Sequence, residues 1–160
     1  MSQSEVDTAR HIMWRAYQKH MAGALEKAIA LYQQSIELHP TTEAHTFLGW
    51  AFSMQGHYEK AIEECLQAIT LDDQYGNPYN DIGVYLMALN RWNDAISWLE
   101  RAIAAPRYDQ RAMPYLNLAR IYRHFGEDFK MLRAYRSAWE LDLSQISTLD
   151  ALQLAVGKLT

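Results

Sequence analysis

Apolar residues along this chain recur three or four positions apart, which is the spacing of a helix that buries one face. Residues 58–71 show the pattern clearly, because glutamate and glutamine occupy the positions between the apolar ones. The apolar positions there are Tyr58, Ala61, Ile62, Cys65, Leu66 and Ile69. This spacing continues along the chain in place of the strict alternation that strands require. The pattern therefore predicts an all-α protein.

Residues that interrupt helices divide the chain into pairs of predicted helices. Gly23, Gly56, Asn90 and Gly126 stand between the two helices of each pair, where the chain must turn sharply. The predicted pairs are 6–22 with 25–38, 42–55 with 58–71, 77–89 with 92–104, and 111–125 with 128–141. A lone helix at about 146–156 follows them, and we expect it to cover the last exposed face.

One motif occurs twice in phase between Thr42 and Tyr108, with every member of the second copy 34 residues after its counterpart. The matching positions are Leu48, Gly49, Gly56, Tyr58, Ala61 and Ala68, followed by Ile82, Gly83, Asn90, Trp92, Ala95 and Ala102. A fixed period of this length indicates stacked helical repeats. Small residues such as Gly49 and Gly83 allow two helices to approach closely. One pair cannot bury its apolar face alone, so neighbouring pairs must stack on it.

This motif resembles the tetratricopeptide repeat. The resemblance covers about 9–143 and implies an α-solenoid, a right-handed superhelix of antiparallel helix pairs whose first helices line a concave groove. We expect one domain over 1–160, with repeats at about 9–41, 42–75, 76–109 and 112–143. The outer repeats match less closely, because Lys19 stands where an aromatic is usual and Met131 where alanine is usual. The resemblance implies a protein-interaction module.

The family's groove positions give the candidate site. They correspond here to Met13, Trp14, Tyr17, Phe47, Trp50, Asn80, Asp81, Val84, Asn117, Arg120 and Arg123. The groove would be aromatic in its N-terminal half and polar to basic in its C-terminal half. Large aromatic side chains on a concave surface are typical interface anchors. The alternative is that Trp14 or Trp50 fills the core between repeats.

Some members of this family hold the carboxylates of a chaperone C-terminus with two lysines, two asparagines and an arginine. Carried over to repeats one to three, those positions hold Met13, Tyr17, Phe47, Asn77 and Asp81. Carried over to repeats two to four, they hold Thr46, Trp50, Asp81, Met113 and Asn117. Neither set supplies the positive charges, so we predict no such clamp.

Charge is unevenly distributed along the chain, whose net charge is −4. Residues 1–106 carry 7 basic and 13 acidic side chains, whereas residues 107–136 carry 7 basic and 3 acidic ones. The basic segment is either an attraction for an acidic partner or the solvated surface of an Arg-rich helix. No apolar run reaches the roughly 20 residues that span a bilayer, and the start is polar. With Cys65 the single cysteine, we expect a cytoplasmic protein that does not insert into membranes.

No pattern in the sequence indicates catalysis. It contains no HExxH, no Cys/His quartet and no Gly-rich phosphate loop, so we predict no enzymatic activity, metal or cofactor. The favoured function is an adaptor or scaffold that binds another protein presenting an apolar anchor and acidic groups. The alternative is an assembly factor that decorates or bridges a filament or multisubunit complex through the Arg-rich fourth repeat, as kinesin light chains act in cytoskeletal settings. The net acidity argues against nucleic acid as a partner, and the oligomeric state stays open.

Overall fold

The computed structural model describes residues 2–141, and over these residues the chain forms eight α-helices. They are α1 (Gln3–Met21), α2 (Leu25–Leu38), α3 (Thr42–Met54), α4 (Tyr58–Leu71), α5 (Asn77–Ala88), α6 (Trp92–Ala104), α7 (Ala112–His124) and α8 (Asp128–Leu141). Between residues 2 and 141 the extended pairing is limited to one isolated parallel bridge, from Tyr75 to Arg107. The all-α prediction is confirmed, whereas the predicted helix at about 146–156 lies outside the described residues.

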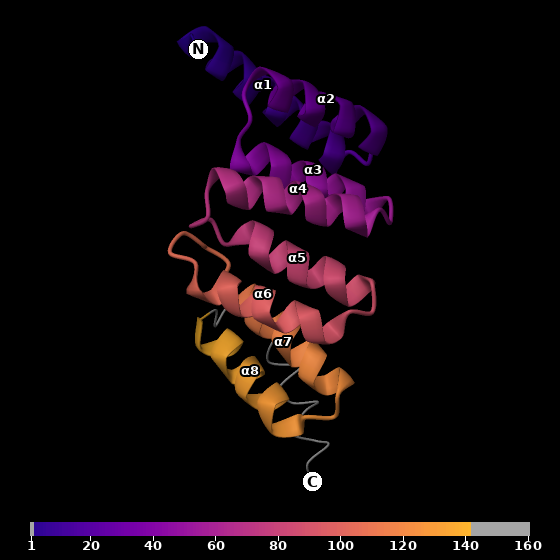
Figure 1. Ribbon diagram of the computed structural model, residues 1–160, viewed down its shortest axis with the longest axis vertical. Coiled ribbons are helices and arrows are strands. Elements are labelled where there is room, and N and C mark those ends of the chain that lie inside the picture. The colour runs from indigo at the N-terminus through magenta and orange to yellow at the C-terminus, as the bar shows by residue number, and fades with distance from the viewer. Residues whose placement is uncertain (1, 142–160) are drawn as a thin grey trace.

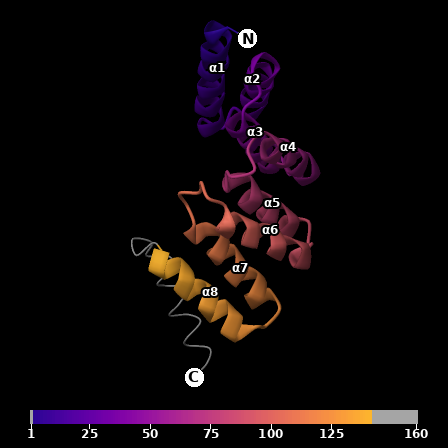
Figure 2. The same cartoon turned by 60° about the vertical axis from the view of Figure 1, so that its left-hand side comes forward.

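The helices stack as antiparallel pairs into an elongated solenoid with α1 and α8 at opposite ends of the stack (Figure 1). Each helix packs against the next one in the chain, and the turned view shows the pairs following one another along the stack (Figure 2). The first helices also contact one another, α1 with α3, α3 with α5 and α5 with α7. The second helices described here make no comparable contacts with one another. Closer spacing on one side curves a solenoid, so α1, α3, α5 and α7 form the inner face.

The turns within the helix pairs use the residues that the sequence places there. Gly23, Gly56 and Gly126 have φ angles of +77°, +80° and +72°, and Asn90 has a φ angle of +60°. This left-handed conformation costs glycine little, and asparagine tolerates it better than most other residues. The predicted helix breakers therefore end the first helix of each pair.

The start of α1 differs from the sequence prediction by three residues, because the helix begins at Gln3 and not at residue 6. The Ser2 hydroxyl accepts a hydrogen bond from the backbone N–H of Glu5, and the Glu5 carboxylate accepts one from the backbone N–H of Ser2. This capping box satisfies two N–H groups that would otherwise lack partners, so it extends the helix into a polar segment. Apolar periodicity alone does not detect it.

Close packing between paired helices depends on glycine at two positions of the inner face. A Cβ atom at Gly83 would lie 2.6 Å from Cδ2 of Leu99, and one at Gly49 would lie 2.9 Å from the backbone oxygen of Ala61. Leu99 and Ala61 are fully buried, which leaves them little room to move. The predicted role of small residues in nesting the helices is therefore confirmed at these positions.

The connection between α6 and α7 folds back along the stack. Tyr108 is buried against Gly76, at the start of α5, where a Cβ atom would come within 2.5 Å of its side chain. The backbone N–H of Gly76 donates to the carbonyl of Arg107 at 3.0 Å, and the N–H of Arg107 donates to the carbonyl of Gln74 at 3.0 Å. This segment thus ties the entry of the fourth helix pair to the connection between the second and third.

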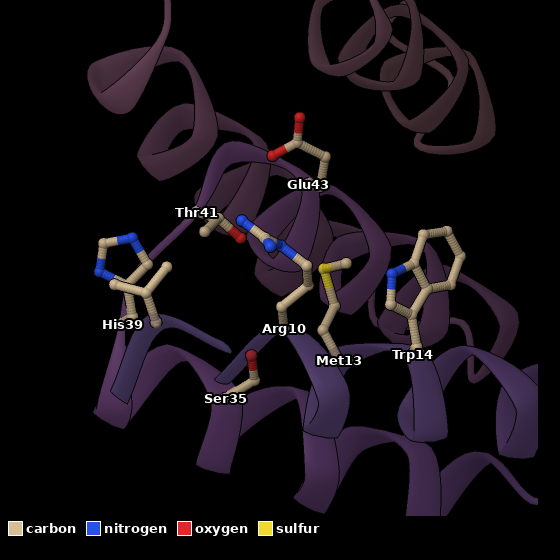
Figure 3. Close-up of a pocket in the computed structure, with 8 residues that line it drawn as sticks. Arg10, Met13, Trp14, Ser35, His39, Thr41 and Glu43 are labelled. Carbon is tan, nitrogen blue, oxygen red and sulfur yellow. The ribbon is translucent and has the colours of Figure 1, made fainter. Parts of the chain in front are cut away.

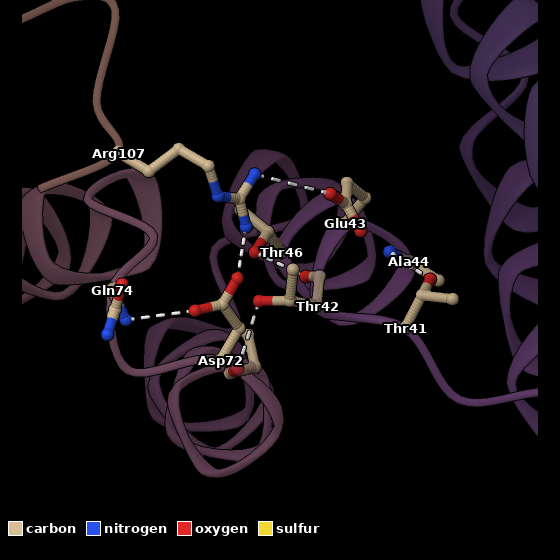
Figure 4. A network of polar contacts seen from close by, with 9 residues as sticks. Thr41, Thr42, Glu43, Ala44, Thr46, Asp72, Gln74 and Arg107 are labelled. Carbon is tan, nitrogen blue, oxygen red and sulfur yellow. Dashed lines mark hydrogen bonds and ion pairs between the residues drawn. The ribbon is translucent and has the colours of Figure 1, made fainter.

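The Arg107 side chain continues this link as far as α3 (Figure 4). Its guanidinium pairs with the carboxylate of Asp72 and lies 3.8 Å from that of Glu43. It also lies 4.6 Å from the centre of the Tyr75 ring. The hydrogen bond from Arg107 is the main cause of the lowered pKa of Asp72. One side chain of the loop thereby links the connection between α4 and α5 to the first turn of α3.

Replacing Arg107 by glutamine should lower the free energy of unfolding only slightly, by less than about 1 kcal/mol, because both ion pairs are exposed. The loss should shrink when chemical denaturation is repeated at high salt, since salt screens exposed charges. Arg91→Gln provides the control, because Arg91 pairs with Asp94 within one turn and bridges no repeats. A loss for Arg107→Gln that does not change with salt would assign the side chain a packing role instead.

Candidate functional site

Four aromatic side chains of the first two inner helices form what we call the aromatic surface: Trp14 and Tyr17 of α1, and Phe47 and Trp50 of α3. The Trp14 and Tyr17 rings are 5.7 Å apart edge to face, and the Tyr17 and Phe47 rings are 5.3 Å apart. The structure leaves 51% of Trp14 and 36% of Trp50 exposed. Both indoles therefore remain accessible after the helices have packed, and neither is wholly used to fill the core.

A buried histidine supports the aromatic surface from behind. The His20 ring lies 4.2 Å from the Trp50 ring and is 1% exposed. Its Nδ1 is 3.2 Å from the hydroxyl of Tyr32 and its Nε2 is 3.0 Å from Sδ of Met54. Burial lowers the pKa of His20 because the charged imidazolium is poorly solvated there. His20 therefore packs against Trp50 in its neutral form.

Stability should fall as the pH is lowered from about 7 toward 5, in part because of His20. A group whose pKa is lowered by folding binds more protons in the unfolded chain, so acid favours unfolding from the ordinary pKa of 6.5 downward. In His20→Gln this contribution disappears, and the loss of stability between pH 7 and 5 should be smaller than in the wild type. Denaturant titrations at several pH values measure it, with exposed His11→Gln as control. Equal pH slopes in wild type and His20→Gln would contradict the assignment.

Two exposed methionines extend the aromatic surface and were not among the predicted site residues. Met21 is 50% exposed and Met54 is 53% exposed, at the C-terminal ends of α1 and α3. Met21 follows Tyr17 by one helical turn, and Met54 follows Trp50 by one turn, so helical spacing could have indicated them. Methionine adapts its shape to different apolar partners and is common on binding surfaces.

The third and fourth repeats contribute a polar chain of hydrogen bonds. Nη1 of Arg120 donates to Oδ1 of Asn117 at 3.3 Å, and Nδ2 of Asn117 donates to Oδ1 of Asn80 at 3.0 Å. Asn80 and Asn117 are buried, so the bond between them joins α5 to α7 below the surface. The side-chain amide of Asn80 also lowers the pKa of Asp81 by a hydrogen bond. The two asparagines therefore position the side chains of Arg120 and Asp81, which are the charged ends of this series of hydrogen bonds.

Asp81, on α5, has a carboxyl group whose pKa differs strongly from its ordinary value. Burial outweighs the hydrogen bond from Asn80 and raises the pKa of Asp81 to about 7. Burial raises the pKa values of the Tyr75, Tyr85 and Tyr108 hydroxyls, and the charge of Asp81 raises them further. The carboxyl group is thus poised between its neutral and charged forms near neutral pH.

The remaining predicted residues are more scattered. Met13 is buried in the N-terminal core beside α2 and α3, and Val84 is half-buried against the core of the later repeats. Arg123 is exposed in the last turn of α7. The structure therefore gathers the predicted residues into two groups, the aromatic surface and the polar chain with Asp81, and leaves these three apart from them.

A cavity of about 340 Å³ opens at the N-terminal end of the inner face (Figure 3). Its lining comes from α1, α2 and the start of α3, namely Val6, Arg10, Met13, Trp14, Ser35, His39, Thr41 and Glu43. Trp14 forms one edge of the cavity and also belongs to the aromatic surface. Helix periodicity does not reveal this space, because two of its lining residues, His39 and Thr41, lie in the connection between α2 and α3.

The basic segment contributes fewer available charges than the sequence suggests. Three of its cations are held in ion pairs with neighbouring acids: Arg107 with Asp72, Lys130 with Glu127, and Arg136 with Glu140. Arg111 donates to three backbone carbonyls at the end of α6 and in the loop after it. Within residues 2–141, Arg120, Arg123 and Arg133 have no carboxylate partner. Four of the seven cations in this segment are thus held by other groups of the same chain.

Two chemical features are absent from the part of the chain that the structure describes. No group of three histidine, cysteine or acidic side chains is placed to hold a metal ion there. None of the described helices is long and apolar enough to cross a membrane. Cys65 is buried, and burial is the main cause of its raised thiol pKa, which makes it a poor nucleophile.

Comparison with known proteins gives two matches to family models described as tetratricopeptide repeat, over residues 42–75 and 79–105. The small glutamine-rich tetratricopeptide repeat-containing protein 2 of Mycosarcoma maydis is 29% identical over 77 residues, which are 48% of this chain and 22% of that protein. An uncharacterized protein of Haemophilus influenzae is 28% identical over 114 residues, 71% of this chain and 56% of that protein. The chain therefore spans only about a fifth and just over half of these two relatives.

Solved structures share the whole described architecture. Pseudomonas aeruginosa pilF superimposes with a TM-score of 0.90 at 18% identity, covering 98% of this chain and 71% of that chain. MamA gives a TM-score of 0.73 at 25% identity, covering 89% and 83%. YrrB, described as a TPR protein with an unusual peptide-binding site, gives a TM-score of 0.67 at 17% identity, covering 92% and 75%. These likenesses confirm the solenoid fold.

Proposed function

Because the chain belongs to the tetratricopeptide repeat family, we propose that it is a non-catalytic adaptor that holds a peptide, a helix or a protein surface on its inner face. The observation that carries this proposal is the exposure of the Trp14 and Trp50 indoles on the first helices. Contiguous exposed aromatic side chains mark interaction sites, and tryptophan is among the strongest contributors to binding energy.

The arrangement of the inner face supports a partner with an apolar anchor. The aromatic surface and the flanking methionines Met21 and Met54 form the apolar part, and Arg120 and Arg123 lie farther along the stack. A helix lays apolar residues into such a groove, and an extended peptide does so with alternate side chains. YrrB, which has the same fold, is described as having a peptide-binding site. We expect acidic groups of the partner to meet the arginines.

Selection of peptides from a random library on the immobilised full chain tests this proposal. Bound peptides should lose roughly tenfold or more in affinity for Trp14→Ala, since half of this indole is exposed and available to a partner. Trp139→Ala is the matched control, because Trp139 is 38% exposed on α8, outside the inner face. Peptides that bind both variants like the wild type, or a library that yields no binder, would contradict the proposal.

The alternative role, an assembly factor that attaches to a filament or multisubunit complex, is favoured by Arg120, Arg123 and Arg133, which lack carboxylate partners in the described structure. PilW, a similar fold with a TM-score of 0.82 at 17% identity, is described as a type IV pilus biogenesis factor. In this role the fourth repeat would contact an acidic surface.

Reversing two charges on α7 distinguishes the roles. If the fourth repeat provides the contact, Arg120→Glu with Arg123→Glu should abolish partner binding, and binding by the wild type should weaken steeply with salt. Arg133→Glu on α8 controls for charge alone. Binding that resists salt and tolerates the double substitution, yet depends on Trp14, would instead support the aromatic surface.

A further inference from the structure

Between residues 2 and 141, the first helices of the pairs carry four carboxylates. Three of these carboxylates have a hydrogen-bond donor or a basic side chain as partner. Glu5 accepts a hydrogen bond from the backbone N–H of Ser2, and Asp7 lies 3.4 Å from Arg10. Glu43 lies 3.8 Å from Arg107. Asp81 has no basic partner within ion-pair distance among the described residues.

Arg107 and Arg120 each have other partners in the described structure. Arg107 pairs with Asp72 and lies over the Tyr75 ring, so its guanidinium is held on the loop. Arg120 donates to Asn117, which in turn donates to Asn80. This chain of bonds orients the Asn80 amide toward Asp81 without neutralising the carboxylate. An ionised carboxylate that is half-buried and lacks a cation lowers stability, and a cation brought by a ligand would offset that cost.

The ligand that fits is an organic cation and not a metal ion. Asp81 is a single carboxylate, and no set of three metal-binding side chains surrounds it within the described structure. A lysine or arginine side chain requires only one carboxylate as its partner.

We propose that the segment bound on the inner face carries a lysine or arginine whose side chain pairs with Asp81, next to apolar residues that pack on Trp14 and Trp50. This inference rests on the proposed adaptor function and adds the chemistry of its partner. It also gives an order along the groove, with apolar anchors at the first two repeats, a basic residue at the third, and acidic groups at the arginines of the fourth.

A double-mutant cycle across the interface tests the pairing. Peptides selected from a random library on the full chain should be enriched in a basic residue close to apolar ones. For the tightest peptide, Asp81→Asn should weaken binding at least about tenfold, because one partner of a largely desolvated charge pair is lost. Changing the basic residue of the peptide to glutamine should have a similar effect, and the two changes together should cost little more than either alone. Glu63→Gln, on the exposed face of α4, removes the same charge away from the groove and should have no effect.

The outcomes separate this inference from the adaptor function. Peptides that require Trp14 but bind the Asp81→Asn variant as tightly as the wild type would overturn the pairing and leave the adaptor function standing. Selected peptides without basic residues would do the same. Peptides that bind independently of Trp14, or a failure to select any peptide, would overturn both.

Discussion

Replacing Leu99 by alanine is expected to lower the free energy of unfolding by about 2–5 kcal/mol, the range for truncating a fully buried leucine. Leu99 is 0% exposed and belongs to the main core cluster, where α6 packs on α5 and α7. The helices are held at a fixed spacing by several contacts, so the vacated space cannot collapse fully. Chemical denaturation followed by circular dichroism measures the change.

Substitution of Gly83 tests whether the close contact with Leu99 is what requires glycine at this position. Gly83→Ala alone should destabilise the protein by about 1–2 kcal/mol, because the new methyl would lie 2.6–2.7 Å from Leu99 side-chain atoms. In the Leu99→Ala background the same change should be neutral or stabilising, since the obstructing atoms are gone and alanine favours a helix by up to about 1 kcal/mol. Equal destabilisation by Gly83→Ala in both backgrounds would show that the contact with Leu99 is not what requires glycine.

Replacing Trp50 by alanine should weaken binding of a partner peptide by about 2 kcal/mol or more, which is roughly 30-fold in Kd. Trp50 packs against His20 and is still 36% exposed. Truncation removes the exposed face and also the support that His20 gives it. Because the ring is partly exposed, we expect the helical circular dichroism to persist and the melting temperature to fall by only a few degrees.

Trp139→Ala is the control for Trp50→Ala as well, because its side chain has nearly the same exposure on a second helix. It should leave the Kd unchanged within about twofold, since surface changes outside an interface have small effects. Loss of the folded state in Trp50→Ala would assign Trp50 to the core between repeats. An unchanged Kd in a folded variant would remove it from the binding surface.

The architecture could be predicted from the sequence because the physics that sets it is local and periodic. Small residues at Gly49 and Gly83, helix breakers at Gly56 and Asn90, and the 34-residue interval each follow from the geometry of a helix pair. The aromatic surface followed from the family's groove positions, and in the structure Tyr17 contacts both Trp14 and Phe47. Whether they bind a partner stays a prediction.

The remaining features depend on contacts between residues far apart in the chain. The bond between Asn80 and Asn117 joins residues 37 positions apart, and the pair of Arg107 with Asp72 joins residues 35 positions apart. Neither pair has a sequence signature, because the connection between α6 and α7 has its own irregular path. Charge counting therefore overstated the basic segment, where several cations meet acids of the same chain.

In the proposed function, the face formed by the first helices binds the partner. Backbone amide shifts of the labelled full chain, recorded during titration with a selected peptide, test it most directly. We expect the largest changes on α1, α3, α5 and α7, concentrated around Trp14, Trp50 and Asp81. Changes concentrated on α2, α4, α6 and α8, with these three residues unaffected, would contradict it.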